Sequence, residues 1–447
     1  MDNNHVGYVV RVKELHPHPN ADRLQIMHLF ETDTVVDLNV HVGDMGVYFP
    51  TELQLSERFC EVNNLVRRKD ENGNEVGGFL DPDKRNIKAI KLRGQKSDGL
   101  YLPITCLTDF CRISDLHEGD RIGVINGEEI CRKYLPQQSG SISYRHKENN
   151  KKTCKEVPYF YKHVETEQLA YNLDAFRPGD IVQITEKLDG TSGRTGNMQV
   201  AHEHRTIWDR LLHRHGKNKM VYEYVTGTRN VVLVSDHQGG FYESDDWRYA
   251  MSKKFENKLP ENMEVFYEIV GFQGPNGCSI MPSVSNSRIN DKNFIKTYGD
   301  TTTFSYGCKN ENGYNDEYPC CQIYVYRIII VTNNGNTIEL SPAQIKYYCE
   351  QWGVNYVPEY ETFIIPQDCT NPGEYVAKKA EQYFDGPSVL DASHIKEGVV
   401  LRICNRNNFI VFKHKNFNYK LLRVFAVEQL EKNRALENMS QDIIEEL

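Results

Sequence analysis

The chain has 447 residues, 39% of them hydrophobic and 11% aromatic, which is enough to bury two or three separate cores, so a multidomain protein is expected. Its apolar stretches fall short of the ~18 residues of a membrane span, and its start lacks the basic and apolar segments of a secretion signal, so an intracellular, cytoplasmic protein with no membrane partner is predicted. The net charge of −9 argues against a protein that coats nucleic acid non-specifically and confines any nucleic-acid site to a local basic patch.

Short strands separated by turn residues are predicted for the first part of the chain, residues 1–136. Residues 6–12 combine β-branched and aromatic side chains, and residues 87–92 carry apolar side chains ahead of the turn residues Arg93 and Gly94. About five such segments with turns between them indicate a small β-barrel.

Two runs in this region resemble the paired signatures of the OB-fold tRNA-binding modules that are attached to some tRNA synthetases. One is HPNADRL at residues 18–24, and the other is LRGQKSDGL at residues 92–100. The resemblance implies that residues 1–136 form an OB-type β-barrel with a surface for nucleic acid. In the alternative interpretation, Pro19 and Gly94 serve only to build turns.

Residues 137–155 are polar and include a basic run from Arg145 to Lys152. Few of them are core formers, so a linker or an exposed loop is predicted between two domains. The positive charge of the run also suits contact with a nucleic-acid backbone, although a solvated loop is the interpretation we favour.

Residues 156–447 alternate between strand and helix patterns, which predicts a mixed α+β domain with a helical C-terminal tail. Together with the barrel, this domain gives an α+β protein. The predicted segments are strands at residues 181–186, 265–270, 323–331 and 398–403, and helices at residues 342–352, 374–384 and 421–447.

Lys187 stands where a predicted strand ends and a turn begins, in the run EKLDG at residues 186–190. Alone, a KxDG string is weak evidence, because Asp-Gly also builds ordinary turns. Five further runs follow it in order, TGTR at 226–229, FYEIVG at 266–271, YVYRI at 324–328, KEGVVLR at 396–402 and FKHK at 412–415. Together they resemble the ordered motifs of the covalent nucleotidyltransferases, the superfamily of DNA ligases, RNA ligases and mRNA capping enzymes.

This resemblance implies that residues 156–447 form an adenylyltransferase domain in which Lys187 takes up AMP covalently from ATP. The implied catalytic residues are Lys187, Asp189, Glu268, Glu397, Lys413 and Lys415. The implied nucleotide-binding residues are Glu186, Lys187, Arg229, Glu268, Tyr326, Lys413 and Lys415.

The chemistry explains why lysines recur in these motifs. A free lysine amine, with a pKa near 10.4, is almost entirely protonated at neutral pH. A lysine nucleophile therefore needs positive neighbours or partial desolvation. Lys413 and Lys415 lie two apart on a predicted strand, so both side chains leave the same face. By the resemblance they bind the α-phosphate, and the alternative is a solvated pair on an edge strand.

A divalent cation, Mg²⁺ or Mn²⁺, is expected to offset the charge of the phosphates during attack on ATP. Asp189, Glu268 and Glu397 are the acids at the matching motif positions and are the predicted metal ligands. Because Mg²⁺ prefers oxygen ligands and keeps several waters, some of these acids are expected to hold it through water.

The run YVYRI supplies a candidate for the adenine-binding aromatic. Tyr324 and Tyr326 are expected to project from one face of their strand, and in the family the aromatic at this motif stacks on adenine. We align Tyr326 with it and keep Tyr324 as the substitute, while two plain core aromatics are the alternative. Arg229 resembles the family's contact to phosphate or ribose, with a surface salt bridge as its alternative.

Two features distinguish members of the superfamily. DNA ligases and capping enzymes commonly have KxDGxR, but Ser192 stands at the arginine position here, a form closer to RNA ligases. Those relatives also carry an OB domain after the last lysine motif, whereas only 32 residues (447 − 415) follow Lys415, too few for the ~70 residues of a small domain. The predicted barrel lies before the transferase domain instead, as in the nick-sealing RNA ligases.

The resemblance to nick-sealing RNA ligases implies an ATP-dependent enzyme that joins an RNA 3′-hydroxyl to a 5′-phosphate through lysyl-AMP and adenylylated RNA. RNA with these two ends is the implied partner, and no obligate protein partner is evident. The alternatives are a capping-type guanylyltransferase and an RNA-binding protein with an inactive transferase fold. A candidate RNA surface, with a solvated helix face as its alternative, is the basic run of Arg205, Arg210, Arg214, Lys217 and Lys219.

Overall fold

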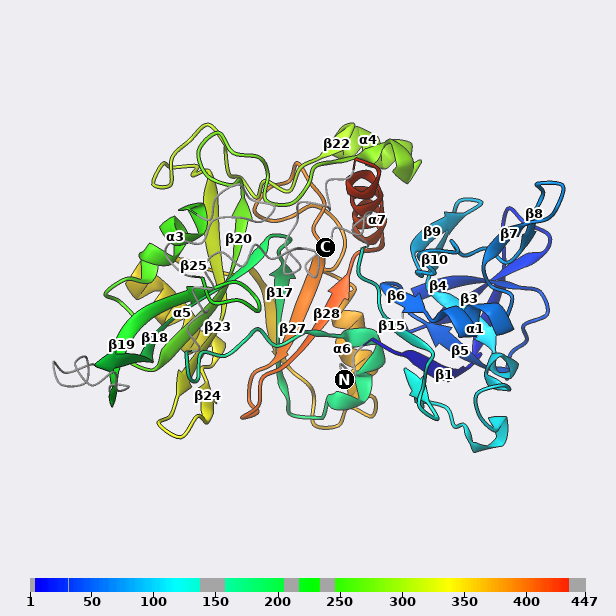
Figure 1. The fold of residues 1–447 in the computed structure, drawn as a ribbon, viewed down its shortest axis with the longest axis horizontal. Coiled ribbons are helices and arrows are strands. Elements are labelled where there is room, and N and C mark those ends of the chain that lie inside the picture. The colour runs from blue at the N-terminus through cyan, green and yellow to red at the C-terminus, as the bar shows by residue number, and fades with distance from the viewer. Residues whose placement is uncertain (1–4, 31, 137–156, 205–216, 234–245, 434–447) are drawn as a thin grey trace, which may run out of the picture. The chain divides into compact units, whose positions relative to one another are not determined.

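The computed structural model describes residues 5–30, 32–136, 157–204, 217–233 and 246–433, and the linker predicted at residues 137–155 lies outside them. The chain divides into two compact units, Met1–Gln138 with Lys420–Glu431 and Ser139–Tyr419 with Lys432–Leu447. Both units contain sheets and helices, so the fold is mixed α+β, as predicted (Figure 1). None of the helices in the described part of the chain combines the length and the apolar character that a transmembrane span requires.

Short strands make up most of the first unit, and those predicted at residues 6–12 and 87–92 are confirmed as β1 and β9. The strands are β1 (Gly7–Arg11), β2 (Glu14–Pro17), β3 (Leu24–Leu29), β4 (Thr32–Asp37), β5 (Met45–Phe49), β6 (Leu53–Leu55), β7 (Arg67–Lys69), β8 (Glu75–Gly77), β9 (Ala89–Leu92), β10 (Gln95–Asp98), β11 (Leu100–Pro103), β12 (Arg121–Ile122), β13 (Val124–Ile125), β14 (Glu128–Glu129) and β15 (Cys131–Lys133). One sheet has the order β11-β5-β1-β12 and another β2-β3-β4, while β7-β8, β9-β10, β13-β14 and β6-β15 form pairs.

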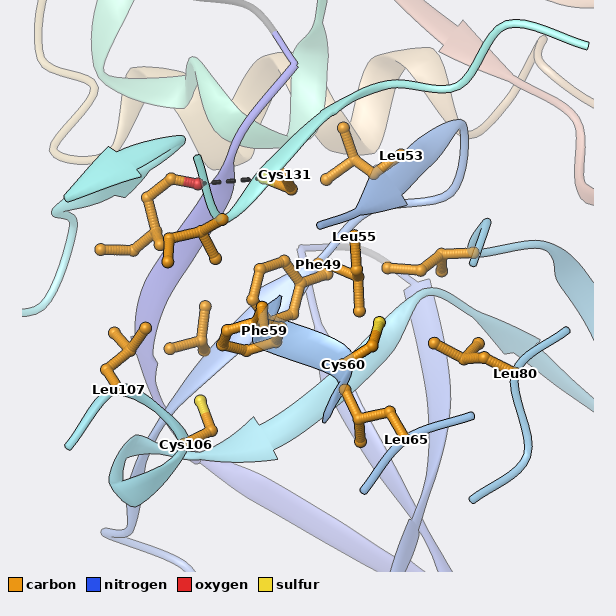
Figure 2. Close-up of a cluster of buried hydrophobic side chains, with 14 of the residues drawn as sticks. Phe49, Leu53, Leu55, Phe59, Cys60, Leu65, Leu80, Cys106, Leu107 and Cys131 are labelled. Atoms are coloured by element: carbon orange, nitrogen blue, oxygen red, sulfur yellow. Dashed lines mark hydrogen bonds between the residues drawn. The ribbon is translucent and has the colours of Figure 1, made fainter. Parts of the chain in front are cut away.

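The apolar core of the first unit gathers around the helix α1 (Glu57–Val62) (Figure 2). The Ser56 side chain accepts a hydrogen bond from the Phe59 N–H and caps the start of this helix. Phe59 is fully buried and contacts the ring of Phe49 at 5.5 Å between centroids. A polar contact closes the cluster, because the Cys131 thiol donates to the carbonyl oxygen of Ile122 at 3.1 Å. The cap therefore orients the face of α1 that fills the core.

The helix α7 (Phe417–Lys432) contributes its later residues to the first unit. Lys420 Nζ lies 2.6 Å from an oxygen of Asp98, whose side chain is only 7% exposed. The hydroxyls of Thr32 and Thr51 donate to the same carboxylate, each at 3.2 Å. A buried carboxylate needs such partners, so Lys420 completes a polar site at the end of β10.

Two glutamates further along α7 add contacts to the same unit. Glu428 pairs with Lys88 at 3.0 Å. Glu431 accepts a hydrogen bond from the Tyr134 hydroxyl at 2.9 Å and pairs with Lys84. The predicted helical tail is thus confirmed as far as Lys432, whereas residues 434–447 lie outside the described part of the chain.

Two large sheets form most of the second unit, and the four strands predicted for it are confirmed as β17, β20, β23 and β27. The first sheet has the order β16-β28-β27-β17-β26 and consists of β16 (Glu167–Gln168), β17 (Ile181–Lys187), β26 (Glu359–Ile364), β27 (Gly398–Ile403) and β28 (Ile410–Lys415). The second has the order β19-β18-β20-β23-β24, with β25 also paired to β23, and consists of β18 (Thr191–His204), β19 (Lys217–Gly227), β20 (Met263–Gly271), β23 (Cys321–Val331), β24 (Thr337–Glu339) and β25 (Asn355–Tyr356). The short strands β21 (Val284–Ser285) and β22 (Thr301–Thr302) pair separately.

The helices of the second unit begin at capping residues. The helix α5 (Pro342–Trp352) coincides with its prediction, because Ser341 and Gln344 form a capping box and Gly353 ends the helix in the left-handed conformation. The helix α6 (Pro372–Ala380) begins and ends earlier than the predicted residues 374–384, since Asn371 caps it ahead of Pro372. The other helices of this unit outside α7 are α3 (Asp246–Ser252) and α4 (Lys292–Tyr298) in the described residues.

A three-residue turn carries the chain from the first sheet of the second unit to the other. β17 ends at Lys187 and β18 begins at Thr191, so residues 188–190 make the crossing. A Cβ at Gly190 would lie 2.2 Å from the carbonyl oxygen of Ile269, and only glycine fits this close approach. The turn therefore fixes where the end of β17 lies in relation to β20.

Replacing Lys420 should destabilise the first unit. In Lys420→Ala the buried carboxylate of Asp98 loses its cation, which is expected to cost about 3 kcal/mol of unfolding free energy. Hydrogen exchange followed by mass spectrometry should show faster exchange in peptides from β4, β5 and β10. Lys13→Ala is the control, because Lys13 is 73% exposed and its ion pair with Glu118 is worth less than about 1 kcal/mol. Equal protection in the two variants would contradict this account.

Candidate functional site

Lys187 is the last residue of β17, and the neighbouring strands place Gly398 and Lys415 beside it. Lys187 pairs with Gly398 of β27, which pairs in turn with Lys415 of β28, and these strands lie side by side (Figure 1). Directly opposed residues point to the same face of a sheet, so the two lysines flank a position without a side chain. A Cβ at Gly398 would lie 2.1 Å from the carbonyl oxygen of His414, and φ is +148°, so the position requires glycine.

Glu397 connects the two lysines. Its Oε2 accepts a hydrogen bond from Lys187 Nζ at 2.9 Å, and its Oε1 lies 3.6 Å from Lys415 Nζ. The side chain of Glu397 is 3% exposed, whereas that of Lys187 is 25% exposed. A buried carboxylate needs cations beside it, and two amines supply them here. The side chain of Lys187 is therefore both ion-paired and partly exposed.

The next row of the same sheet brings Lys413 to this face. Thr185 of β17 pairs with Val400, and Val400 pairs with Lys413. Residues two apart on a strand share a face, so Lys413 points to the side that carries Lys187 and Lys415. Three lysines from two strands are thus gathered on one face of the sheet.

Glu186 precedes Lys187 and points to the opposite face of β17, where it is buried. Its Oε2 accepts hydrogen bonds from the Tyr360 hydroxyl at 2.6 Å and from the Val389 N–H at 3.0 Å. Lys396 Nζ donates to the same Tyr360 hydroxyl at 2.8 Å. The second oxygen, Oε1, is buried and has no hydrogen-bond donor among the described residues. A buried acceptor left in this state is costly unless a ligand supplies a donor.

Tyr306 and His394 hold the turn that follows Lys187. The Asp189 N–H donates to the Tyr306 hydroxyl at 2.6 Å, and the Tyr306 N–H donates to His394 Nε2 at 3.2 Å. His394 Nδ1 lies 3.0 Å from the carbonyl oxygen of Ile395 and must carry the proton, because Nε2 is an acceptor. Burial lowers the pKa of His394 below its ordinary value, which fits this neutral form.

Ser192, Glu268 and Tyr324 form one row across the second sheet. Ser192 of β18 pairs with Glu268 of β20, and Glu268 pairs with Tyr324 of β23. Glu268 is the one residue of β20 that is not buried, while Tyr324 is buried and donates its hydroxyl proton to Gln322 Oε1 at 2.7 Å. The row therefore presents one accessible carboxylate on an otherwise buried strand.

The predicted metal ligands Asp189, Glu268 and Glu397 do not form a preformed metal site in the described residues. Within the described residues, no group of three or more histidine, cysteine, aspartate or glutamate side chains is placed to hold a metal, and Glu397 contacts two lysines instead. Magnesium, however, keeps several waters and takes phosphate oxygens as ligands, so a cation that arrives with a triphosphate needs few protein oxygens. The metal-binding roles of Asp189, Glu268 and Glu397 stay predictions.

Arg229 and Tyr326 contact residues ahead of the sheets. Arg229 pairs with Glu165 at 3.3 Å, and the Tyr326 hydroxyl lies 2.9 Å from His163 Nδ1. Burial, followed by surrounding cations, holds the pKa of His163 well below its usual range. The cations that act on this imidazole are Arg229, Arg327, Lys187 and Lys413.

Sequence motifs did not indicate several of these residues. His163, Tyr306, Tyr360 and His394 lie between the recognised runs and have no characteristic spacing, so one sequence offered no signal for them. Of the predicted basic run, Arg205, Arg210 and Arg214 lie outside the described residues, while Lys217 and Lys219 belong to β19.

His394 should make the protein less stable in mild acid. Well above pH 6.5 its imidazole is neutral in both folded and unfolded chains, but because the folded-state pKa is lowered, the unfolded chain takes up the proton first as the pH falls through this value. In His394→Gln, which keeps an acceptor for Tyr306, the slope of unfolding free energy between about pH 7.5 and 5.5 should be shallower by up to about 1.4 kcal/mol per pH unit. Urea unfolding followed by tryptophan fluorescence measures both slopes. Identical slopes would rule out a buried neutral His394.

Comparison with known proteins identifies the family of this chain. The family model described as RNA ligase matches residues 180–421. No curated protein matches the chain with significance. Among solved structures, the RNA ligase of Naegleria gruberi with pyrophosphate has a TM-score of 0.56 and 17% identity over 93% of this chain and 97% of that chain.

A variant of the same ligase with AMP and manganese has a TM-score of 0.54 and 16% identity over 93% of this chain and 98% of that chain. At this identity the structural likeness shows a shared fold. The family match spans more than half of the chain and contains Lys187, Glu268, Glu397 and both lysines of β28. The protein therefore belongs to the RNA ligase family.

Proposed function

We propose that this protein is an ATP-dependent RNA ligase that joins an RNA 3′-hydroxyl to a 5′-phosphate, in the repair of nicks. The observation that supports it most is the partly exposed side chain of Lys187, whose amine is hydrogen-bonded to a buried Glu397 and flanked by Lys415, in a chain of the RNA ligase family. An amine, a base and a second cation are the groups that covalent transfer of a nucleotide needs.

In the first step, the Lys187 amine attacks the α-phosphorus of ATP. A nitrogen–phosphorus bond forms, the bond to pyrophosphate breaks, and the amine gives up its proton. Glu397 Oε2, at 2.9 Å, is the nearest described acceptor for that proton. Lys413 and Lys415 offset the negative charge that builds up on the phosphate oxygens. A bound Mg²⁺ or Mn²⁺ supplies further positive charge beside the phosphates and the departing pyrophosphate.

Tyr326 is proposed as the aromatic that stacks on adenine, and ATP rather than GTP is proposed as the nucleotide, which separates the ligase from a capping-type guanylyltransferase. The side chain of Glu186 lies buried on the face of β17 opposite Lys187. The nucleotide contact predicted for Glu186 therefore stays a prediction.

Two further steps complete sealing. An oxygen of an RNA 5′-phosphate attacks the phosphorus of lysyl-AMP, which frees Lys187 and leaves adenylylated RNA. A 3′-hydroxyl then attacks the activated 5′-phosphorus, and AMP departs as the new phosphodiester forms. In both steps Lys413 and Lys415 meet the same developing charge as in the first, so one face of the sheet serves all three transfers.

The first unit is proposed to be an OB-type module that contacts the RNA. The two runs that resemble tRNA-binding modules meet here, because His18 Nε2 lies 3.1 Å from the Leu92 carbonyl oxygen and Asn20 Nδ2 donates to the Arg93 carbonyl oxygen at 3.0 Å. Lys91 and Lys96 face each other directly across the β9-β10 hairpin. Two lysines side by side place positive charge beside the second run, which suits contact with a phosphate backbone.

Labelling with radioactive nucleotides tests the first step. Wild-type protein incubated with α-labelled ATP and Mg²⁺ should become labelled, α-labelled GTP should label it poorly, and Lys187→Ala should stay unlabelled. The Lys378→Ala variant is the control, because that lysine is 70% exposed on α6. Addition of nicked RNA should remove the label from the protein and produce a sealed strand. A Lys187→Ala protein that still seals nicks would refute the proposal.

Glu397→Gln should slow lysyl-AMP formation by about 100-fold or more, because the neutral amide neither accepts the amine proton nor offsets the charge of two lysines. A rapid-quench time course at saturating ATP measures this rate. Glu374→Gln, on the exposed first turn of α6, is the matched control and should react at the wild-type rate. A Glu397→Gln rate within about twofold of wild type would remove Glu397 from the reaction.

A further inference from the structure

A short segment ahead of the family match, residues 160–165, is anchored to the second sheet by buried charges. Arg194 Nη1 donates to the carbonyl oxygens of Phe160 at 3.2 Å and Tyr161 at 2.6 Å. The Tyr161 N–H donates to Glu264 Oε2 at 2.9 Å. Arg194 and Glu264 are 2% and 0% exposed, so the path of this segment is fixed from inside the protein.

His163, in the middle of this segment, contacts two of the predicted nucleotide-binding residues, Tyr326 of β23 and Arg229 after the end of β19. Its Nδ1 lies 2.9 Å from the Tyr326 hydroxyl, and the two rings meet edge to face with centroids 5.9 Å apart at 81°. Its backbone N–H donates to the Arg229 carbonyl oxygen at 3.3 Å. Two residues later, Glu165 pairs with the Arg229 guanidinium at 3.3 Å. Residues 160–165 therefore contact the hydroxyl of Tyr326 and both the backbone carbonyl and the guanidinium of Arg229.

Tyr326 needs such a contact because it lies at an irregularity of β23. The strand register places Arg327 opposite Phe266 and Val325 opposite Tyr267, which leaves Tyr326 as an extra residue between them. A bulge of this kind turns a side chain away from the regular alternation, and a side-chain contact must then set its direction. The Tyr326 ring rests on apolar residues of the sheet, and His163 supplies the polar contact at its hydroxyl.

We propose that His163 is a positioning residue of the nucleotide site, which sets the ring plane of Tyr326 and the position of Arg229 and extends the site to a segment ahead of the family match. The inference rests on the proposed function. Stacking depends on the orientation of the aromatic plane. Loss of the hydrogen bond between His163 and Tyr326 is therefore expected to weaken nucleotide binding more than it slows the transfer step. Burial lowers the pKa of His163 most, and nearby cations lower it further; these cations include Lys187 and Lys413, the residues expected to meet the triphosphate.

A double-mutant cycle on the hydrogen bond tests this inference. His163→Phe keeps a ring without its nitrogen, Tyr326→Phe removes the hydroxyl, and each should raise the ATP concentration for half-maximal lysyl-AMP formation by about 2- to 10-fold, with little change in the maximal rate. The double variant should be no worse than either single variant. His163→Asn, which restores a polar group near Nδ1, should return the ATP dependence to within about twofold of wild type.

ATP binding to the same variants in a Lys187→Ala background, measured by isothermal titration calorimetry, separates this inference from the proposed function. Weaker binding on loss of His163 supports the inference even if the wild type never becomes labelled. His28→Phe is the control, since His28 also hydrogen-bonds a side chain, Asp33, but belongs to the first unit. Unchanged ATP binding in both single variants, or effects that multiply in the double variant, would overturn the role of His163. If His163→Phe fails to fold, Tyr326→Phe still tests the same hydrogen bond, because it removes the hydroxyl that His163 contacts.

Discussion

The site depends on one buried carboxylate held between two amines. Glu397, almost excluded from water, contacts Lys187 and Lys415 at once. Charges this close are stable only as a set, because removal of either sign leaves the other without compensation. Gly398 makes the arrangement possible, since it leaves the sheet open between the two lysines. Phosphate oxygens of a bound nucleotide can therefore replace Glu397 as the anionic partners of Lys187 and Lys415 at the end of β17.

The strands that carry this site could be predicted because their patterns obey simple rules. Apolar runs and alternation predicted β17, β20, β23 and β27, and the two-residue spacing of Lys413 and Lys415 fixed their common face. The helix α5 was predicted to the residue, since its capping box and terminal glycine are local signals. Strands and helix ends that depend on residues close together in the chain could therefore be predicted from the sequence.

Contacts between distant segments could not be predicted in this way. Tyr306 reaches Asp189 from 117 residues away, and His163 reaches Tyr326 from 163 residues away, and no spacing rule connects such positions. Within the first unit, Lys420 of α7 likewise pairs with Asp98, 322 residues away. These contacts depend on tertiary packing, which cannot be predicted from a single sequence by local patterns.

The most direct test of the central claim is to locate the covalent nucleotide. Protein treated with ATP and Mg²⁺ should be digested near neutral pH, where the phosphorus–nitrogen bond survives, and its peptides sequenced by mass spectrometry. The account predicts AMP on a single lysine, Lys187, in the peptide that contains the turn after β17. AMP on another residue, or its absence from a protein that nevertheless seals RNA, would contradict the account.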